Sequence, residues 1–174
     1  GPVVLVVMDG VGLAEDNPYN AVTQAHLETL HELMQKYPMA ELGAAGRYVG
    51  IPDGDMGNSE VGHNAIGAGQ VFAQGAKLVS SSIESGKIFA SETWKSLTSY
   101  CKNGTLHFIG LFSDGNVHSH INHLKAMIEQ AKKMGVSKVR VHILLDGRDV
   151  GETSALDYIL PFEDFLSELR SSDF

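Results

Sequence analysis

Apolar runs that alternate with amphipathic segments dominate the chain and predict an α/β fold. Three long runs are predicted to be strands: Val3–Met8, Thr105–Phe112 and Val139–Leu145, with Met39–Leu42 as a shorter candidate. Val3–Met8 is continuously apolar and rich in β-branched residues, the pattern of a parallel strand that is buried on both faces. An Asp-Gly or Ser-Asp-Gly turn and a helical segment follow each long run. This order indicates βαβ units whose ligand-binding edge lies at the carboxyl ends of the strands.

Helical spacing of apolar residues predicts the segments between the strands. The predicted helices are Ala21–Lys36, which Pro38 ends, Glu60–Ala68, Ser91–Lys102, His120–Met134 with Gly135 as its C-cap, and a helix that Thr153 or Ser154 caps. Glycines near Val71–Gly75 suggest a domain boundary, so we expect domains over 1–73 and 74–174.

Composition and charge narrow the classes of function. The chain has 174 residues, a net charge of −8 and a single cysteine, Cys101. The acidic balance argues against a nucleic-acid partner, which would normally meet a basic face. The lone cysteine fits a reducing compartment, and neither an apolar run of membrane-spanning length nor a leader segment is apparent, so we expect a cytoplasmic protein without a membrane partner.

The densest cluster of candidate chemistry is Gly54–His63, here called the Ser59 loop. It holds three glycines, a serine, a histidine and two acids in ten positions. A serine on such a turn before a helix suits an anion site at the helix N-terminus or a nucleophile for a phosphoryl group. The alternative is a tight turn in which Asn58 or Ser59 caps the helix. The loop alone does not separate these interpretations.

Polar residues after the three strands are further candidates. Asp9 suits a hard metal ion or a phosphate site, or else forms an ordinary turn. The histidines His118, His120 and His123 are close enough to suggest zinc, but no cysteine accompanies them, and His118 before the helix is better placed to contact a phosphate.

Arg148 and Asp149 combine a cation that can grip a phosphate with a candidate acid or base, or else form a loop salt bridge. The G-x-S-x-G elbow of serine hydrolases is absent around Ser59. An activated Ser59 would therefore need a metal ion to stabilise its alkoxide. Phosphoryl transfer to this serine is the interpretation that uses the most of these residues.

These motifs together resemble cofactor-independent phosphoglycerate mutase. The resemblance rests on Val4–Gly10, Gly50–His63, Ser113–His120 and Asp146–Asp149, which occur in family order, and Met56–His63 is its most specific part. It implies an alkaline-phosphatase-like metal domain with an inserted α/β phosphotransferase domain, each present in part. It also implies the interconversion of 3-phosphoglycerate and 2-phosphoglycerate without a bisphosphoglycerate cofactor.

Carried over by position, the resemblance implies that Ser59 is phosphorylated and that Asp9 and Ser59 are ligands of one metal ion. It implies that His118, Arg148 and Asp149 hold the substrate, with Asp149 as a proton-transfer partner. Two divalent ions are expected, manganese first, with magnesium or cobalt as alternatives. The small phosphoglycerate is the expected partner, and we expect the complete protein to be a monomer.

The chain departs from the family in two ways. Val150-Gly151-Glu152 replaces a Thr-Pro-Pro sequence that many relatives have after the Arg-Asp pair, which changes loop stiffness more than chemistry. The family chain is also much longer, so the remaining metal ligands, substrate arginines and a catalytic lysine are expected beyond Phe174. Two other functions stay open: a metal-dependent phosphatase or phosphonate-type hydrolase of the same superfamily, and a non-catalytic fragment. We expect the 174 residues alone to be inactive.

Overall fold

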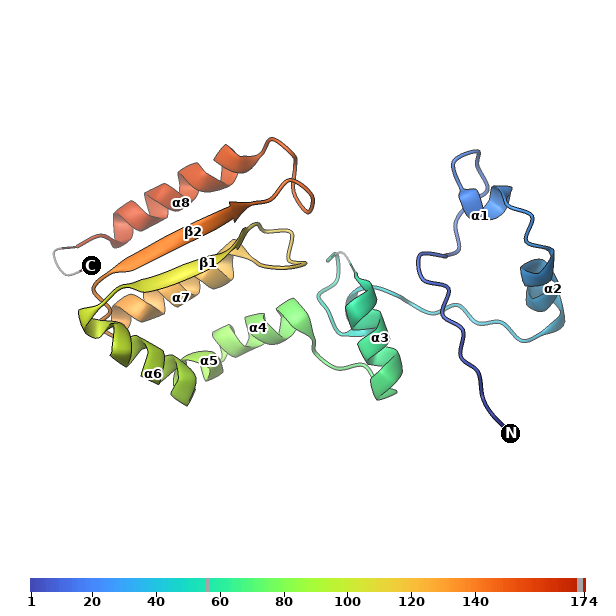
Figure 1. The fold of residues 1–174 in the computed structure, drawn as a ribbon, viewed down its shortest axis with the longest axis horizontal. Helices are drawn as coiled ribbons and strands as arrows, with labels where there is room; N and C mark the ends of the chain where they lie inside the picture. Colours follow the sequence, from blue (N-terminus) through green and yellow to red (C-terminus); the bar gives the residue numbers. More distant parts are fainter. Residues whose placement is uncertain (56, 172–173) are drawn as a thin grey trace. The chain divides into compact units, whose positions relative to one another are not determined.

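The computed structural model describes residues 1–55, 57–171 and 174. The chain divides into two compact units, 1–42 and 43–174 (Figure 1). The domain boundary that the glycines predict near residues 73 and 74 stays a prediction. Among the described residues, no helix is long and apolar enough to cross a membrane.

The first unit holds two short helices, α1 (Ala21–Gln24) and α2 (Glu28–Lys36). Asn20 caps α1, because its side-chain oxygen accepts hydrogen bonds from the N–H groups of Val22 and Thr23. The single helix predicted over 21–36 is interrupted, because α1 ends at Gln24 and α2 begins only at Glu28. None of its residues is buried, so no packing on an apolar face supports a longer helix.

The strand predicted over Val3–Met8 is wrong for this structure. These residues are irregular and exposed, with Val3 95% and Val7 46% accessible. A strand needs a neighbouring strand to pair its N–H and C=O groups, and the described residues provide no such ladder here. Residues 39–42 are irregular for the same reason, so that strand prediction is also wrong.

The second unit contains the remaining helices and both strands (Figure 1). In chain order they are the 3-10 helix η1 (Gly46–Val49), α3 (Ser59–Ala68), α4 (Gly75–Glu84), α5 (Lys87–Ala90), α6 (Glu92–Tyr100), the 3-10 helix η2 (Cys101–Asn103), β1 (Leu106–Phe112), α7 (Ile121–Lys133), β2 (Val139–Leu145) and α8 (Ala155–Leu169). The predictions for α3, α6, β1, α7, β2 and α8 are confirmed to within two or three residues at each end. Gly135 has the positive φ of 84° expected of a helix C-cap.

The two strands form a parallel sheet in which Leu106 pairs with Val139 and Phe112 pairs with Leu145. α7 connects them, which makes the predicted βαβ unit, and the fold class is α/β. Apolar residues of α7 and α8 pack on one face of the sheet around Phe112, Ile128 and Phe162. The Phe112 and Phe162 rings meet edge to face with their centroids 4.9 Å apart.

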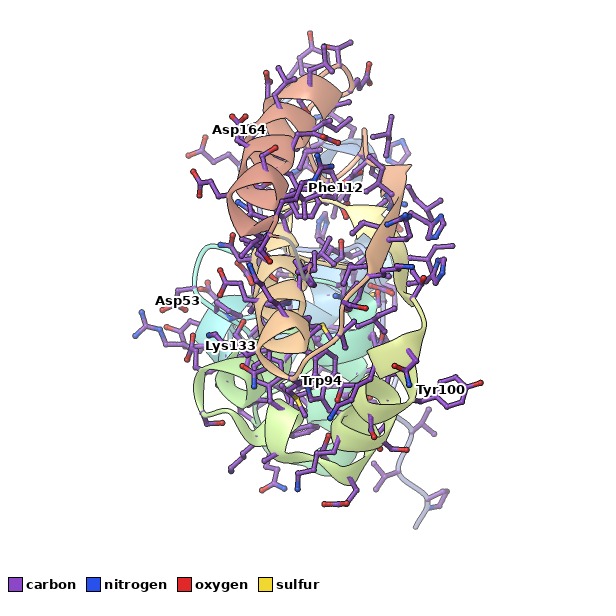
Figure 2. The ribbon with its side chains drawn as sticks, turned by 90° about the vertical axis from the view of Figure 1, so that its left-hand side faces the viewer. Asp53, Trp94, Tyr100, Phe112, Lys133 and Asp164 are labelled. Atoms are coloured by element: carbon purple, nitrogen blue, oxygen red, sulfur yellow. The ribbon has the colours of Figure 1, made fainter. Side chains whose placement is uncertain are left out.

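A second core cluster fixes the amino end of the sheet to α6 and α7. It comprises Trp94, Cys101, Leu106, Ala131 and Val136. The Trp94 indole N–H donates to the Met134 sulfur at 3.1 Å, which satisfies the polar atom of this buried ring. Figure 2, in which Trp94 and Phe112 are labelled, shows the two clusters at different levels of the unit. The loops that follow β1 and β2 begin at the carboxyl ends of the strands.

Candidate phosphoryl-transfer site

Ser59 is the first residue of α3 and is exposed. Asn58 precedes it in an extended conformation, and its side-chain oxygen accepts a hydrogen bond from Val61 N–H at 3.1 Å. Asn58 therefore caps α3. It is one of the two residues that the sequence analysis considered for this cap. Ser59 stands at the end of the helix where the backbone dipole favours an anion. Met56, within the most specific part of the family motif, lies outside the described residues.

His63, one turn along α3, is tied back to the serine. Its Nδ1 atom lies 2.7 Å from the Ser59 carbonyl oxygen. Because a carbonyl oxygen can only accept a hydrogen bond, the Nδ1 atom of His63 carries a proton and donates it to this contact. The ring thus steadies the first turn of the helix that presents Ser59.

An ion pair holds the segment that leads into the Ser59 loop. Asp53 Oδ1 accepts a hydrogen bond from Arg47 N–H at 2.9 Å, and Asp53 Oδ2 lies 2.9 Å from a terminal guanidinium nitrogen of Arg47 (Asp53 is labelled in Figure 2). The backbone N–H of Arg47, helped by its charge, lowers the pKa of the Asp53 carboxyl below its ordinary value. The carboxylate form is the one that closes this turn.

A buried glutamine joins this segment to α3. Gln74 is only 5% exposed, and its side-chain NH₂ donates to the carbonyls of Val49 at 2.9 Å and Val61 at 3.0 Å. Its backbone N–H donates to the Gly50 carbonyl at 3.1 Å. Gly50 has φ 82°, and a Cβ there would lie 1.7 Å from the Phe72 carbonyl oxygen, so only glycine fits.

The loop after β1, Ser113–His120, is here called the β1 loop. Ser113 is buried, and its hydroxyl accepts a hydrogen bond from Gly115 N–H at 3.0 Å. The Tyr158 hydroxyl of α8 donates to Asp114 Oδ1 at 2.9 Å. That contact raises the pKa of Tyr158. His118 lies in this loop and is exposed. The loop is therefore held at its base, with His118 presented to solvent.

The loop after β2, Asp146–Asp149, is here called the β2 loop. Asp146 Oδ1 accepts hydrogen bonds from Arg148 N–H at 2.9 Å and Asp149 N–H at 3.2 Å, which is an Asx-turn. Arg148 is exposed and Asp149 is half-buried. Among the described residues neither forms a salt bridge, so the ion-pair alternative for this pair is not seen.

The three loops meet. A Cβ on Gly115 would lie 2.6 Å from the Asp149 Cβ, so the β1 and β2 loops are in close contact. Asn116 Nδ2 donates to Asp55 Oδ2 at 2.5 Å, which joins the β1 loop to the Ser59 loop. The second unit thus brings together the segments that carry Ser59, His118 and the Arg148–Asp149 pair.

Asp9 lies in a turn of the first unit, next to Gly10 with φ 79°. Its pairing with Ser59 as ligands of one metal ion stays a prediction. Within the part of the chain that the structure describes, no group of three His, Cys, Asp or Glu residues could hold a metal ion. The zinc alternative for the three histidines is therefore not supported. His123 Nε2 instead lies 2.9 Å from the Ser80 hydroxyl, and burial lowers the pKa of His123.

Sequence reasoning missed the residues that organise these loops. Asn116 has a positive φ of 61°, and its place after Ser-Asp-Gly is a turn signal that could have identified it. The sequence places Asp146 in the turn after a strand and in a family motif, but it does not show that its side chain accepts from the N–H groups of Arg148 and Asp149. Gln74 gave no signal, because a lone glutamine before a helix has no distinctive pattern.

Comparison with known proteins identifies the family. A family model described as BPG-independent PGAM N-terminus matches residues 79–173, more than half of the chain. A probable 2,3-bisphosphoglycerate-independent phosphoglycerate mutase of Leptospira interrogans is 54% identical over 98% of this chain and 32% of its own length. The 2,3-bisphosphoglycerate-independent phosphoglycerate mutase of Clostridium novyi is 47% identical over 97% of this chain and 33% of its own length.

A solved structure agrees with these relatives. The phosphoglycerate mutase of Leishmania mexicana, determined at low cobalt concentration, matches with a TM-score of 0.83 and 42% identity, over 96% of this chain and 31% of that one. The chain therefore spans about a third of the length of the relatives it matches. It belongs to the family of 2,3-bisphosphoglycerate-independent phosphoglycerate mutases.

Proposed function

We propose that this chain is the N-terminal part of an enzyme that interconverts 3-phosphoglycerate and 2-phosphoglycerate through a phosphoserine at Ser59, without bisphosphoglycerate. One observation carries the proposal: the Ser59 loop, the β1 loop and the β2 loop adjoin through the Asn116–Asp55 and Gly115–Asp149 contacts. A serine at a helix N-terminus and residues able to grip a phosphorylated acid then lie on adjoining segments.

In the proposed reaction the Ser59 hydroxyl oxygen bonds to the substrate phosphorus as the bond from phosphorus to the glycerate oxygen breaks. The serine proton leaves, and the departing glycerate oxygen gains one. Reversal of these steps with the other glycerate hydroxyl forms the isomer. His118 and Arg148 hold the acid by charge and hydrogen bonds, and the half-buried Asp149 passes the proton between the hydroxyls.

The metal requirement is part of the same proposal. Two divalent ions, manganese in preference to magnesium or cobalt, are implied by the resemblance, with Asp9 and Ser59 as ligands. The described residues hold no three-ligand cluster, so they do not by themselves make a metal site.

The domain assignment also belongs to this proposal. Residues 1–73 are proposed as part of an alkaline-phosphatase-like domain and 74–174 as part of the inserted phosphotransferase domain. The family model, which begins at residue 79, supports an inserted unit that starts near this point. The cytoplasmic location and the monomeric state of the complete protein stay predictions.

Phosphorus NMR on the full-length protein with 3-phosphoglycerate tests the reaction. We expect 2-phosphoglycerate to form in the wild type and in Ser99→Ala, a change at an exposed serine of α6, but not in Ser59→Ala. Residues 1–174 alone should give negligible turnover. Release of inorganic phosphate without 2-phosphoglycerate would indicate the hydrolase alternative. Full turnover by Ser59→Ala would overturn the nucleophile assignment.

A further inference from the structure

The link between the Ser59 loop and the β1 loop is a single charge-assisted hydrogen bond. Asn116 Nδ2 and Asp55 Oδ2 are 2.5 Å apart and come from segments 61 residues apart in the chain. The carboxylate can only accept, so the amide group that faces it must be the NH₂ group. Hydrogen bonds to an ionised acceptor are about twice as strong as neutral ones.

The Asn116 side chain has a fixed direction because its backbone is fixed. Asn116 has φ 61°, a left-handed conformation that asparagine and aspartate tolerate better than other side chains. The residue before it, Gly115, donates its N–H to the Ser113 hydroxyl and lies in close contact with Asp149. Among the described residues the Asn116 Oδ1 atom has no hydrogen-bond partner, so the donor half of the amide carries the contact.

The Asp55 side of the link is also anchored. Asp55 N–H donates to the Pro52 carbonyl at 3.4 Å, which closes a turn. Asp53 within that turn is held by Arg47. The hydrogen bond therefore joins two segments that are each ordered by their own contacts. Asp55 lies four residues before Ser59, and Asn116 lies two residues before His118.

We infer that Asn116 is a positioning residue that sets the distance between Ser59 and the phosphoryl group of the bound acid. This inference rests on the proposed function. The β1 and β2 loops hold the substrate through His118, Arg148 and Asp149, and Asn116 fixes the Ser59 loop against them. Loss of the Asn116–Asp55 hydrogen bond should leave the substrate-holding groups in place but misplace the Ser59 hydroxyl. We therefore expect kcat to fall by a larger factor than the factor by which KM changes.

An exchange of the two side chains tests the inference in the full-length protein. Asn116→Asp keeps the shape and tolerates the left-handed backbone, but it sets two carboxylates against each other. The double variant Asp55→Asn with Asn116→Asp restores one donor and one acceptor with reversed polarity. Asn103→Asp, the same change at an exposed residue of η2, is the matched control.

We expect Asn116→Asp to lower kcat for 3-phosphoglycerate by about tenfold or more with KM within about threefold of wild type, because small misplacements of reacting groups are costly. The exchanged pair should recover kcat to within about threefold, as a cycle of two interacting sites requires. The control should keep wild-type constants. An unchanged kcat in Asn116→Asp, or failure of the exchange to recover it, would contradict the inference. If Asn116→Asp does not fold, the exchanged pair must recover both folding and kcat.

Hydrogen–deuterium exchange separates this inference from the proposed function. The Asp55 and Gly115 amides, which donate to the Pro52 carbonyl and the Ser113 hydroxyl, should exchange faster in Asn116→Asp and return toward wild-type rates in the exchanged pair, whatever the enzyme does. Wild-type protein without mutase activity would refute the proposed function, whereas unchanged exchange of these amides would refute the link itself.

Discussion

Gly115 and Asp149 are in such close contact that the β1 and β2 loops could not adjoin in this way with any larger residue at position 115. A Cβ at Gly115 would lie 2.6 Å from the Asp149 Cβ and 3.1 Å from the Asp149 carbonyl oxygen. The Asx-turn of Asp146 in turn sets the direction of Asp149. The position of Arg148 and Asp149, the proposed substrate-holding pair, thus depends on Gly115 in the β1 loop.

Gly115→Ala should therefore destabilise the fold and displace the β2 loop. We expect a loss of about 1–3 kcal/mol in the free energy of unfolding, the usual cost of overpacking, measured by urea unfolding. Gly104→Ala is the control, because a Cβ at Gly104 meets nothing within 4 Å. Equal stability of the two variants would show that the contact is not tight in solution.

Gly50→Ala should disrupt the base of the Ser59 loop. Gly50 and Gly54 both have positive φ, 82° and 91°, but only the Gly50 Cβ position clashes, at 1.7 Å from the Phe72 carbonyl oxygen. Gly54→Ala thus shows the cost of the backbone conformation alone, about 1–2 kcal/mol. Gly50→Ala should cost clearly more, and it should speed exchange of the Gln74 amide. Equal unfolding free energies would contradict the clash.

Gln74→Glu tests the buried clamp on α3. The glutamate cannot donate when ionised, so the Val49 and Val61 carbonyls lose their partner. We expect a loss of about 2–3 kcal/mol in unfolding free energy, the cost of leaving buried polar groups unsatisfied. Gln70→Glu, at an exposed residue, should stay near wild type. A Gln74→Glu variant as stable as Gln70→Glu would mean that the clamp contributes little.

The β2 loop should make stability depend on pH in the acid range. The Ser113 hydroxyl beside the carboxyl and the Arg148 N–H hold the pKa of Asp146 below its ordinary value of 3.8. A carboxyl whose pKa is lower in the folded than in the unfolded state stabilises the fold at pH values above the unfolded-state pKa. That contribution to the unfolding free energy is lost as the pH falls through the folded-state pKa.

Asp146→Asn removes this proton-linked contribution while it keeps an oxygen that can accept from the loop N–H groups. Its unfolding free energy should fall less steeply than that of wild type between about pH 5 and pH 2. Asp164→Asn, at an exposed carboxyl of α8 labelled in Figure 2, should follow wild type. Parallel curves for Asp146→Asn and wild type would exclude Asp146 as the titrating group.

Periodicity was a good guide to the second unit because its elements pack on one another. β1, α7 and β2 lie almost where the apolar pattern predicts them, since Phe112 and Ile128 bury each other there. The Val3–Met8 run is more continuously apolar than β1 or β2, but it has no paired strand among the described residues. A strand depends on a partner elsewhere in the chain, and the apolar pattern of one segment carries no information about that partner.

The candidate site shows a similar division. The sequence motifs mark Ser59, His118, Arg148 and Asp149 as candidates, because their residue types suit phosphoryl chemistry, and the roles of these residues stay predictions. The contacts that bring their loops together, through Asn116 and Gly115, depend on side-chain direction and close backbone approach. Sequence spacing does not determine either.

The most direct measurement of the central claim is the modification state of Ser59 during turnover. Full-length protein is mixed with 3-phosphoglycerate, quenched rapidly in acid and digested, and the peptide that contains Ser59 is analysed by mass spectrometry. We expect one added phosphoryl group on Ser59 in wild type and none in Ser59→Ala, together with loss of mutase turnover in that variant. Turnover with an unmodified Ser59 at every quench time, or a phosphoryl group on another residue, would contradict it.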